Sequence, residues 1–436
     1  MYSMNEDEKR YIYGECPRCG NINRFLYDRE LDVMICMCCG GFIHGEPEKR
    51  IVWKLALSDF LTYKVFKKDP EFSILGHVLL YYNRDQEKVN VPNGVRKIGK
   101  IAFNYQSDVK EIILPKSVKK IDKAAFNNDM KKIVLPEGLK KIGAWAFNGC
   151  WKLKEIKLPK RIKKIENGVF CCCHALEAIV IPPGVKKIGN YAFCNCESLL
   201  EIEIPKSVKY IGENAFDNCK RIMEIDLPDN IAFIGKNAFT NCESLRKINI
   251  PDGINTIYFG TFSGCKRLTE ITLPDSVAEI HEFAFFGCNL LKKINIPKGV
   301  SSIGRDAFYN CANITEVTLP DSVNKIGNGA FDFCKSLKKI NIPDGVTSIG
   351  SGTFARCESL TEITLPNSLT KIGWKAFEGC KSLRKIHIPH GVAVIEEDAF
   401  KGCAELSDIK LPKNAKIADN AFDGCIKLDF EKQHCK

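Results

Sequence analysis

Residues 268–290 read LTEITLPDSVAEIHEFAFFGCNL, and this pattern is repeated along most of the chain. Its fixed positions are Leu, Ile, Leu-Pro, Val and Ile, followed by Ala-Phe and Cys. The proline recurs at Pro92, Pro115 and Pro136 and then every 23 residues from Pro159 to Pro412, which gives fifteen repeats. Repeats of this length are typical of solenoids, in which each unit buries its apolar face only against its neighbours.

Each repeat predicts one rung of the solenoid. In residues 268–290 the segment TEIT alternates outward polar and inward apolar side chains, as a strand does. Pro274 ends the strand because proline cannot donate the next ladder hydrogen bond, and Asp275-Ser276 supplies the turn. The residues predicted to fill the core are Leu268, Ile271, Leu273, Val277, Ile280 and Phe285. One strand in each rung predicts a parallel β-sheet.

The repeated text I-x-L-P-x-S-V-x-x-I-G-x-x-A-F-x-x-C-x-x-L covers about residues 85–430 and resembles the BspA-type leucine-rich-repeat family. The resemblance implies a repeat solenoid, here a stack of about fifteen 23-residue rungs with a parallel β-sheet. It implies little about function, because repeat surfaces serve many different partners. We expect three parts: a zinc-ribbon-like module at 1–47, a capping helix and hairpin at 48–90, and the leucine-rich-repeat solenoid at 91–436.

Two C-x-x-C pairs lie near the N-terminus, Cys16 with Cys19 and Cys36 with Cys39. Four thiolates at this separation suit a tetrahedral structural zinc site, and the alternating sequence between the pairs predicts a hairpin, so the segment resembles a zinc ribbon. Cys39 is favoured over Cys38 as a ligand because glycine follows it, as glycine follows Cys19. The zinc either only holds a small fold together or also supports docking to nucleic acid or protein.

Residues 48–68, EKRIVWKLALSDFLTYKVFKK, predict an amphipathic helix. We expect it to cover the open end of the solenoid, and a membrane-surface helix is the alternative. The segments from Phe72 to Tyr82 and from Lys88 to Val91 predict a capping hairpin. No apolar run is long enough to predict a membrane span.

Thirteen of the 22 cysteines follow the repeat phenylalanine by three residues, one in each rung from Cys150 to Cys425. In a register-true stack these side chains run parallel, which argues against disulfides and predicts a ladder of buried free thiols. Free thiols favour a reducing compartment and, with no apparent secretory signal, a cytoplasmic location; the cell surface is the lower-ranked alternative. Cys171 and Cys194 occupy one position on adjacent rungs beside His174, either as crowded core or surface thiols or as a second metal or redox site.

The later repeats alternate in charge at one outward strand position. This position is occupied by Lys247, Glu270, Lys293, Glu316, Lys339, Glu362, Lys385 and Asp408. The repeating unit here is therefore two rungs, or 46 residues. Opposite charges on neighbouring strands contribute about 0.2–1 kcal/mol each, so the pattern predicts a self-neutralised face.

The early repeats are basic: residues 91–165 hold 19 Lys and Arg against 6 Asp and Glu, in a chain of net charge +11. Pairs of basic residues lie between the Val and Ile core positions of five successive rungs. They are Arg96, Lys97, Lys119, Lys120, Lys140, Lys141, Lys163, Lys164, Lys186 and Lys187. Stacked like charges repel one another, so the pattern predicts either a solubilising face or a surface for a polyanion. Trp145, Trp151 and Tyr191 are candidate stacking surfaces in this region.

The sequence contains no phosphate-binding loop, dinucleotide fingerprint or H-E-x-x-H motif, and its seven histidines are scattered. We therefore predict that the protein is not an enzyme. The leading interpretation is a binding scaffold that recognises a protein partner along the repeat surface, with structural zinc as cofactor. The alternative is nucleic-acid or other polyanion binding through the zinc ribbon and the lysine pairs. A second alternative is surface adhesion, because members of the resembled family are often surface proteins that bind host or matrix components.

Overall fold

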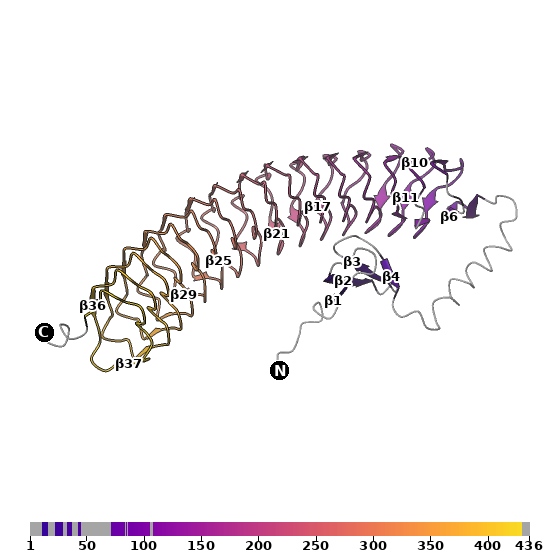
Figure 1. The fold of residues 1–436 in the computed structure, drawn as a ribbon. Helices are drawn as coiled ribbons and strands as arrows, with labels where there is room; N and C mark the ends of the chain where they lie inside the picture. Colours follow the sequence, from indigo (N-terminus) through magenta and orange to yellow (C-terminus); the bar gives the residue numbers. More distant parts are fainter. Residues whose placement is uncertain are drawn as a thin grey trace. The chain divides into compact units, whose positions relative to one another are not determined.

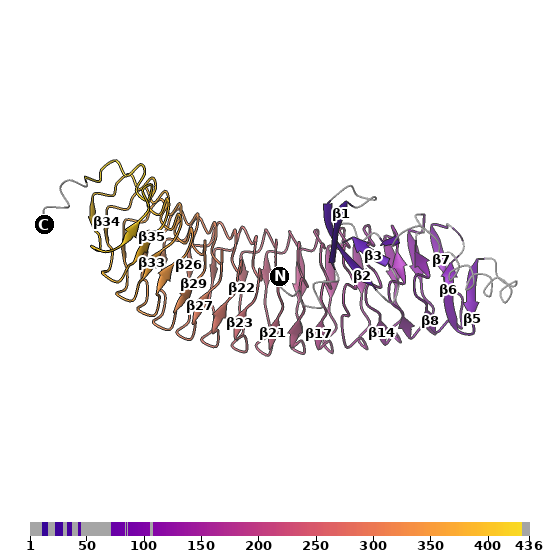
Figure 2. The same ribbon diagram turned by 90° about the horizontal axis from the view of Figure 1, so that it is seen from below.

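The computed structural model describes residues 11–15, 22–28, 33–36, 42–44, 71–82, 84, 86–104 and 108–429. Contacts within the chain divide it into two units, Met1–Val208 and Lys209–Lys436. In each unit the repeats form solenoid rungs that lie side by side in sequence order (Figures 1 and 2). The predicted solenoid of about fifteen rungs is confirmed, whereas the predicted helix at 48–68 lies outside the described residues.

A four-stranded antiparallel sheet precedes the repeats in unit 1. Its strands, in sheet order, are β1 (Tyr11–Glu15), β2 (Ile22–Asp28), β3 (Val33–Cys36) and β4 (Phe42–His44). β2 and β3 pair in antiparallel register, which confirms the predicted hairpin. Of the four predicted zinc ligands, Cys16, Cys19 and Cys39 lie outside the described residues, and only the backbone of Cys36 lies among them.

Most rungs have two short strands, where the sequence predicts one; in the rung of Pro159 the second is only an isolated bridge at Ile165. In residues 268–290, β24 (Glu270–Ile271) precedes Pro274 and β25 (Glu279–Ile280) follows it. Both strands pair in parallel with the next rung, so the solenoid carries two sets of parallel strands. The prediction of a single strand per rung is wrong, but all the predicted inward positions from Leu268 to Phe285 are buried.

In unit 1 the first strand set begins with β7, which pairs in parallel with β10 and does not belong to the capping hairpin in which the sequence placed it. This set comprises β7 (Lys88–Asn90), β10 (Glu111–Ile113), β13 (Lys132–Val134), β15 (Glu155–Lys157), β16 (Ala178–Val180) and β18 (Glu201–Glu203). The second set comprises β6 (Val78–Tyr82), β8 (Lys97–Ile98), β11 (Lys120–Ile121), β14 (Lys141–Ile142) and β17 (Lys187–Ile188). β5 (Phe72–Leu75) forms the predicted antiparallel hairpin with β6, and β9 (Phe103–Asn104) pairs in parallel with β12 (Phe126–Asn127).

Unit 2 also has two sets of parallel strands. The first set comprises β20 (Glu224–Ile225), β22 (Lys247–Ile248), β24, β26 (Lys293–Ile294), β28 (Glu316–Val317), β30 (Lys339–Ile340), β32 (Glu362–Thr364), β34 (Lys385–His387) and β36 (Asp408–Lys410). The second set comprises β19 (Tyr210–Ile211), β21 (Phe233–Ile234), β23 (Thr256–Ile257), β25, β27 (Ser302–Ile303), β29 (Lys325–Ile326), β31 (Ser348–Ile349), β33 (Lys371–Ile372), β35 (Val394–Ile395) and β37 (Lys416–Ile417).

A column of phenylalanine rings, one per rung, runs through the core of each unit. In unit 1 the centroids of neighbouring rings lie 5.0–5.6 Å apart from Phe103 to Phe193. In unit 2 they lie 5.1–5.7 Å apart from Phe216 to Phe422. Each stacked pair contributes about 0.5–1.5 kcal/mol beyond its area burial. The ring spacing also gives the rise from one rung to the next.

Left-handed backbone conformations bracket this phenylalanine in most rungs, two residues before it and two residues after it. Around Phe239 these residues are Asn237 and Asn241, with φ of 52° and 53°. Glycine and asparagine adopt this conformation at little cost, whereas a larger side chain costs about 1–2 kcal/mol. Phe333 and Arg356 occupy the second position with φ of 59° and 56°, so these two rungs carry backbone strain.

The predicted ladder of buried free thiols is confirmed from Cys150 to Cys425. The thiols also donate hydrogen bonds to the backbone carbonyl of the phenylalanine one rung earlier. Cys288 donates to Phe262 and Cys311 donates to Phe285, both at 3.2 Å. The thiols therefore link neighbouring rungs as well as filling space, and burial raises the pKa of Cys288 to about 12.

Asparagine side chains bind the backbone of the preceding rung every 46 residues in unit 2. Asn295 donates from Nδ2 to the carbonyl of Leu273 and accepts at Oδ1 from the Leu273 amide, both at 2.9 Å. Asn249 and Asn341 make the same pair of hydrogen bonds. The two-rung unit predicted from charge is therefore also a unit of hydrogen bonding.

Candidate binding surfaces

The ten predicted basic residues form two columns beside the second strand set of unit 1. The outer column is Arg96, Lys119, Lys140, Lys163 and Lys186; the inner column, next to the buried isoleucine of each rung, is Lys97, Lys120, Lys141, Lys164 and Lys187. Parallel pairing places Lys120 in register with both Lys97 and Lys141. Like charges are therefore stacked from rung to rung.

Asp122 partly neutralises the inner column. Its two carboxylate oxygens lie 2.7 Å from Nζ of Lys97 and 2.8 Å from Nζ of Lys120. Partial burial raises the pKa of Asp122, but the hydrogen bonds from both lysines lower it by more, so the carboxyl stays below its usual value. A depression of about 410 Å³ lies here, lined by Lys97, Lys100, Lys120, Asp122, Lys123, Lys141, Gly143, Ala144 and Glu166.

The outer column has no such compensation. All five of its residues are exposed, and none has a carboxylate oxygen within 4.0 Å among the described residues. Lys119 donates to the carbonyl of Lys116 at 3.1 Å, which orients the side chain without neutralising its charge. Backbone hydrogen bonds of 2.8 and 2.9 Å join Lys119 to Arg96 and Lys140 to Lys119. The outer column is therefore an ordered row of uncompensated positive charge.

Trp145 and Tyr191 offer no stacking surface, contrary to the sequence-based suggestion. They are 5% and 8% exposed and pack in a cluster with Ala124, Cys171, Cys172 and Cys194. The ring of Trp145 has room because Gly168 lacks a side chain: a Cβ at Gly168 would lie 2.0 Å from Cε3 of Trp145. The cluster is therefore part of the core.

The suggested second metal or redox site at Cys171 and Cys194 has no support in the geometry. Both thiols are buried, and Sγ of Cys171 lies 3.6 Å from Sγ of Cys172. His174 lies near a carboxylate instead, with Nδ1 3.9 Å from Glu197. Within the described part of the chain, no group of three or more His, Cys, Asp and Glu residues is suited to a metal ion. Cys171 and Cys194 are therefore crowded core thiols, as the other interpretation of the sequence holds.

The alternating charges of unit 2 lie in the predicted register. Glu270 pairs with Lys293, and Lys385 lies between Glu362 and Asp408. Lys385 and Asp408 form an ion pair at 3.2 Å. Because both signs alternate at every rung, this face presents no net field of one sign to a ligand.

Unit 2 carries five aromatic side chains in mutual contact, which we call the aromatic strip: Phe259, Phe283, Phe286, Tyr309 and Phe333. The centroid distances between successive members are 5.3, 5.7, 4.7 and 5.4 Å. Phe259 is 39% exposed, and the other four are partly exposed. Sequence reasoning missed this surface, although extra aromatic residues near the repeat phenylalanine in four successive rungs are a signal for it.

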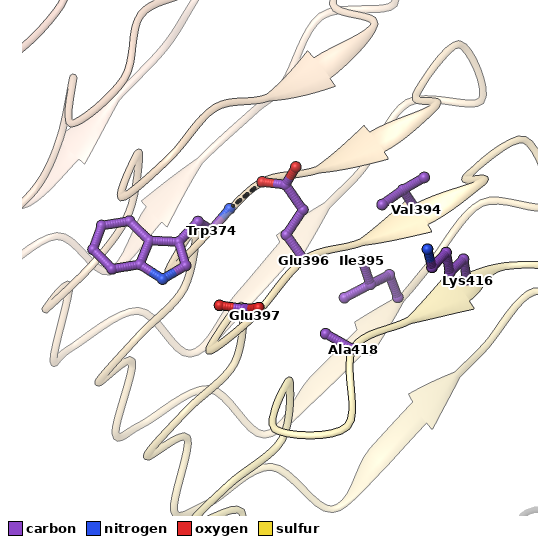
Figure 3. A pocket seen from close by; sticks show the side chains of 7 residues that line it. All are labelled: Trp374, Val394, Ile395, Glu396, Glu397, Lys416 and Ala418. Atoms are coloured by element: carbon purple, nitrogen blue, oxygen red, sulfur yellow. Dashed lines mark hydrogen bonds between the residues drawn. The ribbon is translucent and has the colours of Figure 1, made fainter.

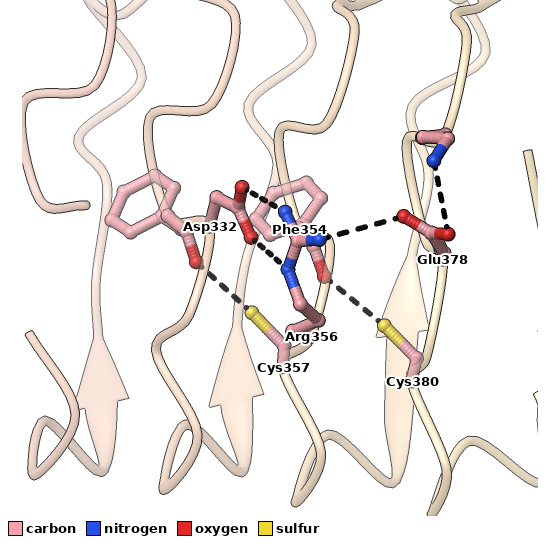
Figure 4. A network of polar contacts seen from close by, with 8 residues as sticks. Asp332, Phe354, Arg356, Cys357, Glu378 and Cys380 are labelled. Atoms are coloured by element: carbon pink, nitrogen blue, oxygen red, sulfur yellow. Dashed lines mark hydrogen bonds and ion pairs between the residues drawn. The ribbon is translucent and has the colours of Figure 1, made fainter. Parts of the chain in front are cut away.

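Arg356 lies at one end of the aromatic strip. Ion pairs to Asp332 and Glu378 hold its guanidinium in place (Figure 4). Its guanidinium donates to both oxygens of the buried Asp332 carboxylate, at 3.0 and 2.5 Å, and stacks over the Phe333 ring at 4.1 Å. Nη1 lies 3.7 Å from Oε2 of Glu378. Burial raises the pKa of Asp332 by more than Arg356 lowers it, and the hydrogen bond to Asp332 raises the pKa of Arg356. Phe333 is therefore held in one orientation.

A second depression, of about 440 Å³, lies near the C-terminal rungs of unit 2 (Figure 3). The Trp374 ring beside it is 46% exposed. Glu396 accepts a hydrogen bond from the Trp374 amide at 2.8 Å and an ion pair from Lys371 at 2.5 Å. The lining residues are Trp374, Val394, Ile395, Glu396, Glu397, Lys416 and Ala418. They include no nucleophile paired with a base.

Comparison with known proteins identifies relatives of the repeats. Residues 75–200, 186–315 and 301–429 each match the BspA type leucine-rich-repeat region. The structure is similar to that of a leucine-rich repeat protein from Bacteroides ovatus, with 29% identity, coverage of 84% of this chain and 91% of the other, and a TM-score of 0.56. It is also similar to a leucine-rich cell surface protein from Faecalibacterium prausnitzii, with 28% identity, coverage of 79% and 93%, and a TM-score of 0.52.

No curated protein sequence matches the chain. Within the described residues, no helix has the length and apolar character that crossing a membrane requires.

Proposed function

Because the chain belongs to the BspA type leucine-rich-repeat family, we propose that it is a non-catalytic scaffold that recognises a protein partner. Leucine-rich-repeat proteins are generally binding scaffolds or adhesins. The observation that carries the proposal is the aromatic strip. Exposed aromatic and arginine side chains are the residues that most often dominate protein interfaces.

Backbone strain within the strip supports the same proposal. Phe333 has a left-handed φ of 59°, at a position where most other rungs carry glycine or asparagine. Strain of this kind persists at sites where the side chain is needed. The bidentate contact from Arg356 to Asp332 immobilises its guanidinium over Phe333 and lowers the entropy cost of binding there.

Replacing Phe333 by asparagine is expected to abolish partner binding without unfolding unit 2. The change relieves about 1–2 kcal/mol of backbone strain and removes ring contacts of about 0.5–1.5 kcal/mol, so the urea midpoint stays nearly unchanged. Loss of an aromatic residue that dominates an interface costs about 2 kcal/mol or more of binding. The measurement is capture of partners from native lysate, followed by affinity measurement with the captured protein.

The matched control is Val180→Asn, which also removes an exposed apolar side chain, 71% exposed and outside unit 2. This control is expected to bind normally. Equal capture by the Phe333 variant and the wild-type chain would remove the strip as the recognition surface.

The basic columns support a second candidate function, binding of nucleic acid or another polyanion. The five exposed, uncompensated charges of the outer column repel one another and do not stabilise the fold. Binding to generic duplex and single-stranded DNA should weaken linearly in a log–log plot against salt concentration. Absence of all binding at about 50 mM salt, where counterion release is most favourable, would exclude this candidate.

A structural zinc site at Cys16, Cys19, Cys36 and Cys39 remains our proposal for the N-terminal module. Metal analysis should find about one zinc ion per chain, lost when Cys16 and Cys36 are both replaced by serine. The matched control Cys38→Ser should keep the metal. A wild-type chain that holds no zinc after expression in zinc-supplemented medium would contradict the assignment.

Surface adhesion is the remaining alternative to a cytoplasmic scaffold. The similar protein from Faecalibacterium prausnitzii is described as a cell surface protein, which favours this alternative, whereas the free thiols favour a reducing compartment. Labelling intact cells with a membrane-impermeant amine reagent discriminates the two, because a surface protein is labelled before lysis and a cytoplasmic one is not.

A further inference from the structure

We infer that the outer column binds one extended acidic polysaccharide, which lies across the strands and follows the rungs of unit 1. The inference rests on the proposed polyanion binding and specifies the ligand class and the contact line. The residues of the outer column occupy the same position in five successive rungs. They are Arg96, Lys119, Lys140, Lys163 and Lys186.

The spacing of the charges favours an extended chain. Core phenylalanine rings in the same rungs are 5.0–5.6 Å apart, so one outer-column charge recurs at about this interval. An acidic polysaccharide carries its carboxylates at intervals close to the length of one sugar ring, which is similar to the rise of one rung. Each strand of a nucleic-acid duplex instead winds away from a straight row of charges within part of a turn, so a duplex can contact only part of the column.

The two columns differ in how many carboxylates lie near them, and this difference favours ligand binding at the outer column. Asp122 engages Lys97 and Lys120 of the inner column, and Glu166 also lines the adjoining depression. These carboxylates reduce the positive field over the inner column and repel an approaching polyanion. The outer column has no carboxylate within 4.0 Å among the described residues, so its field is the stronger of the two.

The side chains also favour a polysaccharide over single-stranded nucleic acid. Proteins that bind single strands combine a basic groove with aromatic rings on which bases stack. Of the three aromatic residues predicted as stacking surfaces, Trp145 and Tyr191 are buried in the core and cannot serve as such rings, and Trp151 is only partly exposed.

The test compares two triple variants of the full chain that remove the same charge from the same three rungs. The outer variant is Lys119→Gln, Lys140→Gln and Lys163→Gln; the inner variant is Lys120→Gln, Lys141→Gln and Lys164→Gln. The probe is a polygalacturonate decamer, with a DNA oligomer of ten thymidines as comparison, both measured by fluorescence polarisation from about 50 to about 200 mM salt.

The outer variant should bind the decamer at least about tenfold more weakly, with the log–log salt slope lower by about one for each lysine removed. The inner variant should lose less affinity than the outer variant and stay within about threefold of wild type. Asp122 pairs with Lys120, and Glu166 lines the same depression as Lys141, whereas Lys164 has no ion pair among the described residues. Thermal melting should show the outer variant to be at least as stable as wild type, because the change relieves repulsion between neighbouring rungs.

Equal loss in the two variants would overturn the assignment to the outer column. Tighter binding of the thymidine oligomer than of the decamer would overturn the ligand class and leave polyanion binding intact. No binding of either probe at about 50 mM salt would remove polyanion binding itself, and the inference with it.

Discussion

Raising the pH from about 8 to about 11 is expected to unfold unit 2 in one steep step, because its buried thiols ionise only when they reach water. Burial raises the pKa of Cys288 from 9.0 to about 12 and raises those of Cys265 and Cys311 well above 9.0. The same direction holds for each rung cysteine of unit 2 from Cys242 to Cys425.

The direction of the change in stability with pH follows from the thiol pKa in the folded and in the unfolded chain. Below pH 9 the thiol is neutral both folded and unfolded, and the stability of the fold is fully present. Above pH 9 the unfolded chain loses the proton while the folded chain keeps it, so stability falls until the folded pKa is reached. For Cys288 that window runs from about 9 to about 12.

The magnitude is large because the thiols act together. One pKa unit corresponds to about 1.4 kcal/mol, so nine thiols together withdraw on the order of 12 kcal/mol at one pH unit above the unfolded pKa. Domain stabilities are about 5–15 kcal/mol. We therefore expect the midpoint of unfolding near pH 10, well before the thiols could ionise inside the folded core.

The measurement is an alkaline titration followed by far-ultraviolet circular dichroism and by the absorbance of thiolate. The loss of circular dichroism should coincide with ionisation of the thiols of unit 2, and at pH 8 the buried cysteines from Cys150 to Cys425 should resist alkylation until the protein is denatured. The variant Cys288→Ala, Cys311→Ala and Cys334→Ala should shift the midpoint to higher pH, which separates thiol ionisation from lysine deprotonation. Alkylation of the buried cysteines of unit 2 near pH 8.5, mapped by mass spectrometry while the circular dichroism is unchanged, would contradict the prediction.

The repeat pattern predicts the rung because apolar positions at a fixed period leave one way to bury them. Leu268, Ile271 and Phe285 are inward as predicted, and the parallel register of Glu270 with Lys293 follows from the same period. The second strand could not be predicted, because Glu279–Ile280 is only two residues long and alternation over two residues is not a signal.

The binding surfaces could be predicted only where their chemistry repeats. The basic columns recur in every early rung, so the sequence reveals them. The aromatic strip depends on backbone conformations that the residue types do not announce, since Phe333 and Arg356 occupy left-handed positions usual for glycine or asparagine. Trp145 fails as a predicted stacking surface for a similar reason: the space over Gly168 belongs to the next rung and cannot be read locally.

Replacing Phe285 by alanine is expected to destabilise unit 2 by about 3–5 kcal/mol, the range for a large cavity in a core. Phe285 is fully buried, with ring centroids 5.5 Å from Phe262 and 5.3 Å from Phe308. The substitution therefore removes two stacked contacts, each worth about 0.5–1.5 kcal/mol beyond burial, in addition to the cavity.

The place of the substituted rung in the solenoid determines which neighbouring rungs lose stability. In a solenoid each rung is stabilised mainly by its two neighbours, so a defect in a middle rung weakens the coupling between the rungs on either side. We expect urea unfolding of the Phe285 variant to become broader, and hydrogen exchange to quicken first in residues 262–308. The hydrogen bond from the Cys311 thiol to the backbone carbonyl of residue 285 does not need the ring and should persist.

The matched control is Phe422→Ala in the last rung, where the ring is partly exposed. Its cavity opens toward solvent and the surrounding rung can relax, so the expected cost is about 1–2 kcal/mol. Phe285→Leu should fall between the two, because it fills most of the space but loses the stacked contacts. If the Phe285 and Phe422 alanine variants lost equal stability, the ring column would not be the continuous element that couples one rung to the next, and the stability of each rung would have to come from its own turns and strand hydrogen bonds.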